Sequence, residues 1–350
     1  MRAIVIEAPG DIRLEEIPEP PMDPRDVLVR VRYCGICGTD LGILDGNMGF
    51  VRSGLIKYPA RIGHEWSGVV EKVGSAVTMV KPGDRVIGDN SISCGECEHC
   101  KKGEYLKCTH RRGSVGTVRC WPGAFADYMR MPEWHLHVLP ENVSFEEAAI
   151  VEPCTIAYNA VLMCRIQGGE TALVIGTGAI GLAAITVAKV FGAGRVIAVG
   201  RQDDKLEIAR KMGADVVINA KKEDVLAAVL RETEGKGADL AVECSGAVEY
   251  IDKASELITG KGIFALAGFY ETTLDGFPID DFVLKAQTLC GTIGHPGVLE
   301  AVVKLISVGR LDVRPLITGI VPMEEGVNAF YESAKSSKGR IKTLIEINRE

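Results

Sequence analysis

The sequence predicts a two-domain α/β protein, in which a β-rich domain is followed by a doubly wound parallel sheet. Three observations support this fold class. The chain has 350 residues, which by ordinary domain sizes suggests two domains rather than one. Up to about residue 150, short β-like runs are closely punctuated by Gly and Pro. From about 171 to 290, apolar strand patterns alternate with helical patterns, and this alternation is typical of a parallel sheet.

The first part of the chain has the pattern of an antiparallel, barrel-like β domain. Runs such as RAIVI, DVLVRVRY and SGVVEKVG are separated by turn-forming stretches such as PEPPMDPRD and VKPGDRV, as expected for strands joined by tight turns. The pattern changes near Pro140. There SFEEAAIVEP predicts a helix that begins with a capping box, with Ser144 as N-cap and Glu147 three residues later.

The second part contains consecutive strand–helix units. TALVIG, RVIAVG, DVVIN, DLAVECSG and GIFALAG are nearly all apolar, as in strands buried on both faces. Helical patterns lie between them, for example AIGLAAITVAKVFG and VEYIDKASELIT. After about residue 292 there is one more helix and a few short strands, too little for a domain. We therefore expect a first domain of residues 1–153 and 293–350 and a second of residues 154–292.

Charge and composition restrict the classes of partner. The formal charge is −7 with both signs interspersed, which argues against nucleic acid or an anionic membrane as the main partner and leaves a small-molecule substrate. No apolar run approaches the roughly 20 residues that span a bilayer. The N-terminus, MRAIVIEAPGDIRLEE, resembles a first strand and not a signal peptide. We expect a cytoplasmic protein, whose 11 cysteines are metal ligands or buried thiols and not disulfides.

The segment CGECEHCKKGEYLKC predicts a structural zinc site. It places Cys94, Cys97, Cys100 and Cys108 at short spacings that are typical of a four-cysteine zinc site. Four thiolates complete the tetrahedron, so no position is left for substrate and the metal stabilises a polar loop. His99 lies within the segment and is expected at the surface.

The segment TALVIGTGAIGLAA predicts a dinucleotide site of the Rossmann type. Gly176, Gly178 and Gly181 form G-x-G-x-x-G between an apolar strand and a helix, which is the context that makes this motif credible. The first glycine permits the tight turn. The second allows the backbone to approach a pyrophosphate at the helix N-terminus.

The end of the second strand favours NADP over NAD. NAD sites usually place Asp or Glu there, whereas this chain has Gly200 and Arg201, and Arg can pair with a 2′-phosphate. Asp203 and Asp204 follow, but they resemble the first turn of the next helix. The candidate cofactor contacts are Gly176, Gly178, Ala179, Ile180, Gly181, Gly200, Arg201 and Lys205.

Three further segments contain candidate ligands of a catalytic metal: YCGICGTD, RIGHEWSG and VEPCTIAYN. They contain, in order, Cys34, Cys37, Thr39 and Asp40, then His64 and Glu65, then Glu152 and Cys154. A set of Cys, His and carboxylate suits a catalytic zinc, which keeps one position open. Spacing alone does not bring these residues together, and each has an ordinary structural explanation as a buried thiol, a core histidine or a surface charge.

These segments together resemble the zinc-dependent medium-chain dehydrogenase/reductase family, which includes alcohol, sorbitol and threonine dehydrogenases. GICGTD, GHEWSGVVEKVG, GDRV, the four-cysteine segment and GTGAIG occur in the order of that family and near its spacing, over essentially the whole chain. The resemblance implies a GroES-like catalytic domain interrupted by a Rossmann domain, with the active site in the cleft between them. It also implies a homodimer or homotetramer.

The resemblance implies roles for individual residues. Cys37 and His64 match zinc ligands, and Asp40 matches the carboxylate that orients the histidine. Glu65 matches a position that ligates zinc directly in sorbitol-dehydrogenase-like members and not in others. Glu152 matches the further ligand position, where the Glu-Pro pair favours a polyol, sugar or cyclitol substrate; which of the two glutamates binds zinc stays open. Cys34 matches no ligand.

The implied reaction is the reversible oxidation of a secondary alcohol. Zinc polarises the hydroxyl oxygen, Thr39 passes the proton on, and hydride moves to the nicotinamide ring. Gly42 stands where many relatives have a histidine of the proton relay, and His295 either contacts the substrate or caps a loop. Alternatives are an L-threonine dehydrogenase and a non-catalytic NADP-binding protein of the same fold. The two zinc motifs disfavour a metal-free quinone reductase.

Overall fold

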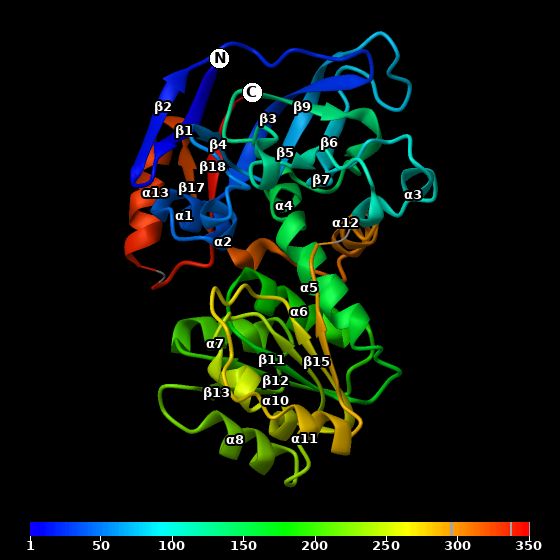
Figure 1. Cartoon of the computed structure of the whole chain (residues 1–350), viewed down its shortest axis with the longest axis vertical. Helices are drawn as coiled ribbons and strands as arrows, with labels where there is room; N and C mark the ends of the chain where they lie inside the picture. The colour runs from blue at the N-terminus through cyan, green and yellow to red at the C-terminus, as the bar shows by residue number, and fades with distance from the viewer. Residues whose placement is uncertain (295–296, 337, 350) are drawn as a thin grey trace. The chain divides into compact units, whose positions relative to one another are not determined.

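The computed structural model describes residues 1–294, 297–336 and 338–349, so His295 lies outside the described residues (Figure 1). The chain divides into two compact units. Unit 1 contains Met1–Glu152, helix α12 (Leu299–Ser307) and the chain from Ile317 onward. Unit 2 begins at Pro153 and also contains Gly309–Leu316. None of the described helices is both long and apolar enough to cross a bilayer.

Unit 1 is built on a mainly antiparallel sheet. Its strands follow the order β10-β6-β5-β3-β18-β17, with β9 also paired to β3, and only β17 and β18 run parallel to each other. The strands are β3 (Asp26–Gly35), β5 (Glu65–Val73), β6 (Arg85–Gly88), β9 (Tyr128–Pro132), β10 (Leu136–Val138), β17 (Ile317–Pro322) and β18 (Lys342–Glu346). The central strand β3 is almost entirely buried, and the predicted β-rich class of this unit is confirmed.

Smaller elements complete unit 1. Strands β2-β1-β4 form a second sheet, and β7 pairs with β8. These strands are β1 (Arg2–Ala8), β2 (Asp11–Glu16), β4 (Ala60–Arg61), β7 (Ser91–Ile92) and β8 (Gly113–Ser114). Besides α12, the helices are α1 (Gly38–Asp45), α2 (Gly49–Arg52), α3 (Glu98–Lys101), α4 (Phe145–Ala149) and α13 (Gly326–Lys335). The capping box of α4 is confirmed: Glu147 N donates to Ser144 Oγ (3.1 Å), and Ser144 N donates to Glu147 Oε2 (2.9 Å).

Unit 2 is a parallel sheet covered by helices, as predicted. The strand order is β13-β12-β11-β14-β15-β16, and every neighbouring pair is parallel. The strands are β11 (Thr171–Ile175), β12 (Arg195–Gly200), β13 (Val216–Asn219), β14 (Ala238–Glu243), β15 (Ile258–Leu266) and β16 (Thr288–Gly291). The helices are α5 (Val151–Met163), which begins at the boundary of the units, α6 (Ala179–Val190), α7 (Asp203–Lys211), α8 (Val225–Glu232), α9 (Glu249–Asp252), α10 (Ala254–Leu257) and α11 (Ile279–Leu284).

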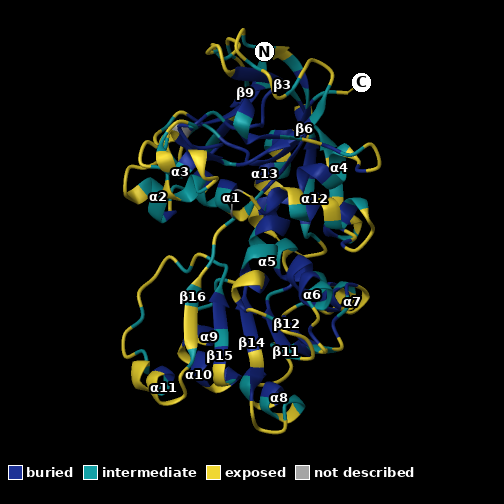
Figure 2. Cartoon of the chain, turned by 90° about the vertical axis from the view of Figure 1, so that its right-hand side faces the viewer, coloured by how far each residue is buried: buried dark blue, intermediate teal, exposed yellow. Residues whose placement is uncertain are grey.

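Two local features of unit 2 differ from the sequence expectation. Strand β16 was not predicted, because its exposed edge position removes the apolar pattern that marks the inner strands; it is drawn mostly yellow in Figure 2. The helix expected over VEYIDKASELIT is two short helices, α9 and α10, which meet at Lys253.

Candidate metal and cofactor sites

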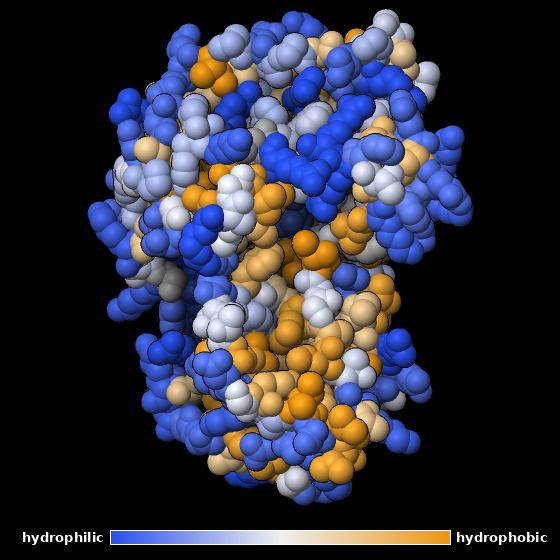
Figure 3. Space-filling model, viewed as in Figure 1, coloured by the Kyte–Doolittle hydropathy of each residue, from blue (hydrophilic) through white to orange (hydrophobic). Residues whose placement is uncertain are grey.

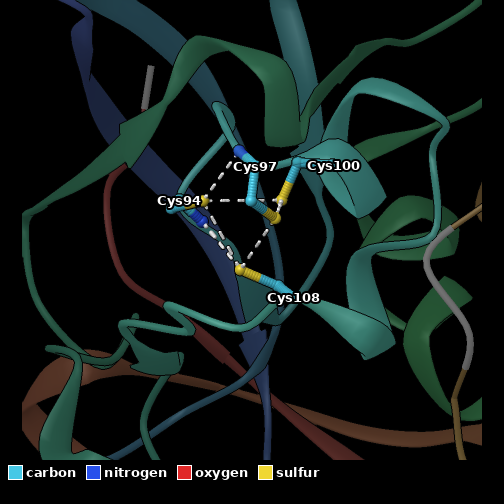
Figure 4. Close-up of side chains that lie close together, drawn as sticks. All are labelled: Cys94, Cys97, Cys100 and Cys108. Carbon is cyan, nitrogen blue, oxygen red and sulfur yellow. Dashed lines mark hydrogen bonds between the residues drawn. The ribbon is translucent and has the colours of Figure 1, made fainter.

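The four cysteines of the lobe around α3 form a site with the dimensions of a zinc tetrahedron (Figure 4). The Sγ–Sγ distances are 3.7 Å for Cys94–Cys100, 3.4 Å for Cys97–Cys100, 4.0 Å for Cys97–Cys108 and 3.6 Å for Cys94–Cys108. Zn–S bonds of about 2.3 Å in a tetrahedron require Sγ–Sγ distances of about 3.8 Å. The residues present therefore fit a structural zinc ion, as predicted.

Backbone groups of the lobe favour the thiolate form of two ligands, Cys94 and Cys97, whereas burial raises the pKa of the Cys100 thiol to about 11. The hydrogen bond from the Cys100 backbone lowers the pKa of the Cys97 thiol to about 5. Cys94 Sγ accepts from the backbone N–H groups of Glu96 (3.5 Å) and Cys97 (3.4 Å). His99 pairs with Glu104 Oε2 at 2.9 Å and is not part of the group of four thiols. Its partly exposed position agrees with the expectation from sequence.

A second group in unit 1 consists of Cys37, His64 and Glu65, whose ligand atoms all lie within 4.8 Å of one another. The pairing of two strands explains why residues so far apart in sequence meet. Gly35 at the end of β3 is opposite Glu65 at the start of β5. The residues just beyond these ends, Cys37 and His64, are therefore brought to the same edge of the sheet.

Asp40 and Gly63 fix the geometry of this second group. Asp40, which is fully buried, accepts from Cys37 N (2.9 Å) and from Gly63 N (3.3 Å). Its Oδ1 lies 3.5 Å from His64 Nδ1, which leaves Nε2 of that ring for a metal ion. Gly63 has φ +100°, and a Cβ there would lie 2.6 Å from Phe125 Cδ2, so only glycine allows this approach.

Lys342 at the start of β18 lies against the same group. Its Nζ donates to Glu65 Oε1 (2.7 Å) and to Ile36 O (3.1 Å), and both charged side chains are buried. Burial lowers the pKa of Lys342, but Glu65, Cys37 and Glu152 together raise it more, so the net pKa is raised. The other oxygen, Glu65 Oε2, has no hydrogen-bond partner among the described residues. A buried carboxylate oxygen without a partner is costly, and a metal ion would satisfy it.

A thiolate, an imidazole and a carboxylate fit a catalytic zinc ion with an open fourth position. Glu152 is outside the group of three, although it interacts electrostatically with His64 and Glu65. Burial raises the pKa of the Glu152 carboxyl to about 7. Among the described residues, Cys34 and Cys154 are buried cysteines that belong to neither metal group. Thr39 lies half-buried in the first turn of α1.

The glycine-rich turn of unit 2 has the geometry of a phosphate cradle. Gly176 has φ +109°, and a Cβ at Gly181 would lie 1.9 Å from Gly176 O, so the turn and the first turn of α6 are in close contact. Gly178 is the N-cap of α6, and a Cβ there would meet nothing within 4 Å. Ala179 and Ile180 follow as the first helical residues. The free N-terminus of a helix of this length suits a pyrophosphate.

The carboxyl end of β12 contains the residues expected to distinguish the two cofactors. A Cβ at Gly200 would lie 2.7 Å from the Thr177 side chain, so no carboxylate fits at that position. Arg201 is exposed and Lys205 is buried in α7. Asp203 accepts from Lys222 Nζ (2.9 Å) and from Asn219 Nδ2 (2.8 Å).

Two buried groups near these sites, Lys342 and Glu243, were not predicted from the sequence. Lys342 begins a short apolar strand, and nothing local marks it as a neighbour of Glu65. Glu243 ends the apolar strand β14 and is fully buried. The sequence signal that could have identified Glu243 was a lone carboxylate at the end of an apolar strand, followed by Cys, Ser and Gly.

Comparisons with known proteins agree with these sites. Residues 23–141 match the alcohol dehydrogenase GroES-like domain, and residues 179–307 match the zinc-binding dehydrogenase domain. A probable D-xylulose reductase A from Aspergillus clavatus is 36% identical over 349 residues, which cover 98% of this chain and 96% of that protein.

Two solved structures share the fold over nearly the whole chain. An oxidoreductase of unknown specificity from Escherichia coli has a TM-score of 0.91 at 29% identity, covering 99% of both chains. A zinc-binding dehydrogenase from Sinorhizobium meliloti bound to NADP has a TM-score of 0.89 at 28% identity, again covering 99% of both chains.

The chain combines one β-rich unit with one Rossmann-type unit, and it has a four-thiolate zinc site and a Cys-His-Glu zinc site. Together these features define a zinc-dependent alcohol dehydrogenase. The chain belongs to the zinc-dependent medium-chain dehydrogenase/reductase family, as its sequence motifs indicated, and its cofactor is a nicotinamide dinucleotide.

Proposed function

We propose that this enzyme reversibly oxidises a secondary alcohol of a polyol, sugar or cyclitol. The observation that supports this most strongly is the metal group of Cys37, His64 and Glu65, in which a carboxylate completes the ligand set. The similarity to D-xylulose reductases over nearly the whole chain supports the same substrate class.

The residues of unit 1 have separate roles in this proposal. Cys37, His64 and Glu65 hold the zinc ion, and Asp40 orients the imidazole. When bound, zinc supplies a Lewis acid for the substrate hydroxyl, and the nicotinamide accepts the hydride. Thr39, two residues after Cys37 on α1, would relay the hydroxyl proton, accepting it from the substrate and giving its own hydroxyl proton to solvent. Gly42 contributes no side chain to a longer relay.

We further propose that NADP is preferred over NAD. A carboxylate is sterically excluded at Gly200, and Arg201 is available for a 2′-phosphate. The nearest carboxylate along the chain, Asp203, is engaged by Lys222 and Asn219. Arg201→Ala should weaken NADPH binding by roughly tenfold or more, as expected for one charge-assisted contact, and leave NADH binding nearly unchanged. Equal effects on both cofactors would contradict the preference.

The direct test is the reduction of NADP and NAD by the zinc-loaded enzyme with polyols, sugars, sugar acids, inositols and L-threonine. Activity with one polyhydroxy class supports the proposal, and activity with L-threonine alone would replace it with the threonine dehydrogenase alternative. If no substrate reacts, the zinc content of the protein distinguishes the two possible explanations. If both metal sites are filled and no substrate reacts, the substrate class is wrong; if only the four-thiolate site is filled, the protein is non-catalytic.

We also propose that the enzyme is a cytoplasmic homo-oligomer whose subunits meet at the edge of the unit 2 sheet. Figure 3 shows apolar side chains gathered over this unit, and Val283 and Leu284 of α11 are 74% and 83% exposed. Strand β16 ends the sheet, and two copies of one edge strand can pair antiparallel about a twofold axis. Light scattering should give at least a dimer, and Leu289→Lys on β16 should shift it toward monomer. A wild-type monomer would overturn this proposal.

A further inference from the structure

Glu243, the last residue of β14, is a fully buried carboxylate whose two oxygens are both used. Oε1 accepts from Ser245 N (2.7 Å) and from the Ser245 hydroxyl. Oε2 accepts from Gly246 N (3.1 Å) and from Tyr270 OH (2.5 Å). Burying a carboxylate is costly unless such bonds compensate, and these four donors supply that compensation.

The four donors come from two different loops. Ser245 and Gly246 belong to the loop after β14, and Tyr270 belongs to the loop after β15. The two loops also touch directly, because a Cβ at Gly246 would lie 2.8 Å from Phe269 O. Burial and the hydrogen bond to Glu243 raise the pKa of Tyr270, so its hydroxyl stays a donor. The Glu243 carboxylate therefore joins the two loops.

The position of these loops in the sheet identifies what they face. The strand order reverses between β11 and β14, and in such sheets the dinucleotide lies across the carboxyl ends of the strands at this point. The glycine-rich turn after β11 lies against the β14 loop, since a Cβ at Gly176 would lie 3.0 Å from Ser245 N. Gly200 and Arg201, on the β12 side, belong to the adenosine half. The loops after β14 and β15 lie on the other side.

We propose that Glu243, held by Tyr270, is a positioning residue for the nicotinamide half of the cofactor. The carboxylate fixes the loops after β14 and β15 relative to the glycine-rich turn and does not touch the reacting atoms. This inference rests on the dinucleotide site described above and is independent of whether NAD or NADP is preferred, because the two cofactors share the nicotinamide half.

Two substitutions test the inference with nearly unchanged shape. Glu243→Gln replaces one acceptor oxygen with an NH₂ group, which would face N–H or O–H donors and cannot accept from them. Tyr270→Phe removes one donor and leaves the other three in place. Glu249→Gln is the matched control, because Glu249 is an exposed carboxylate of the same unit, on α9.

The assay is fluorescence titration with NADH and NADPH, together with competition by ADP, which occupies only the adenosine half. Glu243→Gln should weaken the binding of both reduced cofactors by roughly ten- to hundredfold, as expected when hydrogen bonds to a charged group are lost. Tyr270→Phe should weaken the binding of both by roughly three- to tenfold on the same basis. The affinity for ADP should stay within about twofold of wild type, as for a site whose contacts are unchanged. Glu249→Gln should change none of these affinities.

The possible failures are distinguishable. If the wild-type protein binds neither cofactor, the dinucleotide site itself is wrong and the inference falls with it. If Glu243→Gln binds both cofactors like wild type, the inference alone is overturned. Equal weakening of ADP and NADH, with a lower melting temperature, would show that the carboxylate supports the whole unit and positions nothing. If Glu243→Gln does not fold, Tyr270→Phe tests the inference instead. Weaker binding of NADH with an unchanged affinity for ADP supports the inference, and any other pattern contradicts it.

Discussion

Replacing Gly178 with alanine should weaken cofactor binding without harming the fold. Gly178 has φ −81° and ψ −175° as the N-cap of α6, a conformation that alanine adopts easily. A Cβ there would meet nothing within 4 Å, so the protein has room for the added methyl group. That room lies at the helix N-terminus, where the pyrophosphate must approach the backbone.

The expected magnitudes follow from these contacts. Each charge-assisted hydrogen bond lost from the pyrophosphate costs about 1.5–3 kcal/mol, which corresponds to roughly ten- to hundredfold weaker binding of NADH and NADPH. The melting temperature should stay unchanged or rise slightly, because Gly→Ala at a compatible site stabilises by about 0.4–1 kcal/mol through the unfolded chain.

Gly181→Ala is the matched comparison. Its Cβ would lie 1.9 Å from Gly176 O, and such overpacking costs about 1–3 kcal/mol. At about 2–4 °C per kcal/mol for a domain of this size, the melting temperature of Gly181→Ala should fall by roughly 2–12 °C. Calorimetry and fluorescence titration measure both quantities. A Gly178→Ala variant that binds NADH and NADPH like wild type would refute the assignment of this helix terminus to the pyrophosphate.

Further predictions concern the metal groups and one partly buried histidine, His137. Cys97→Ser should lower the zinc content from two ions to one per chain and lower the melting temperature. Cys290→Ser, outside both metal groups, should change neither quantity. An unchanged melting temperature in Cys97→Ser would contradict a structural role of the four-thiolate site. Cys37→Ala should also lose one zinc ion and abolish turnover while the fold is retained, so most of the activity surviving would contradict the catalytic assignment. Glu65→Gln should lower the occupancy of the catalytic zinc more than Glu152→Gln does, because only Glu65 lies within the group of three, and the reverse order measured by metal analysis would assign the ligand to Glu152. Burial lowers the pKa of His137, but Asp89 (3.3 Å) and Glu300 (3.2 Å) raise it above the ordinary value. The stability from charged His137 is therefore fully present below its unfolded pKa of about 6.5 and is lost as pH rises through the higher folded pKa. His137→Gln should lower the melting temperature at about pH 5.5 and change it little at about pH 9.5, and equal losses at both would disprove the pairing.

Local sequence patterns predicted the elements that obey local rules. The inner strands of unit 2 were predicted because both faces are buried and the residues are nearly all apolar. The capping box at Ser144 was predicted because its hydrogen bonds join residues three apart. Strand β16 was missed because an exposed edge strand needs no such apolar pattern. The break between α9 and α10 at Lys253 was missed because no Gly or Pro marks it in the sequence.

The sequence by itself determined the family, the four-thiolate site and the glycine-rich turn, because in each case the relevant residues lie within a short segment whose spacing sets their geometry. Only the tertiary structure decided how Cys37, His64 and Glu65 meet, since that depends on the pairing of β3 with β5. It also decided that Lys342 lies against Glu65 and that Glu243 joins two loops. These contacts join strands and loops distant in the chain, and a buried charge finds its partner through strand register, which no local pattern encodes.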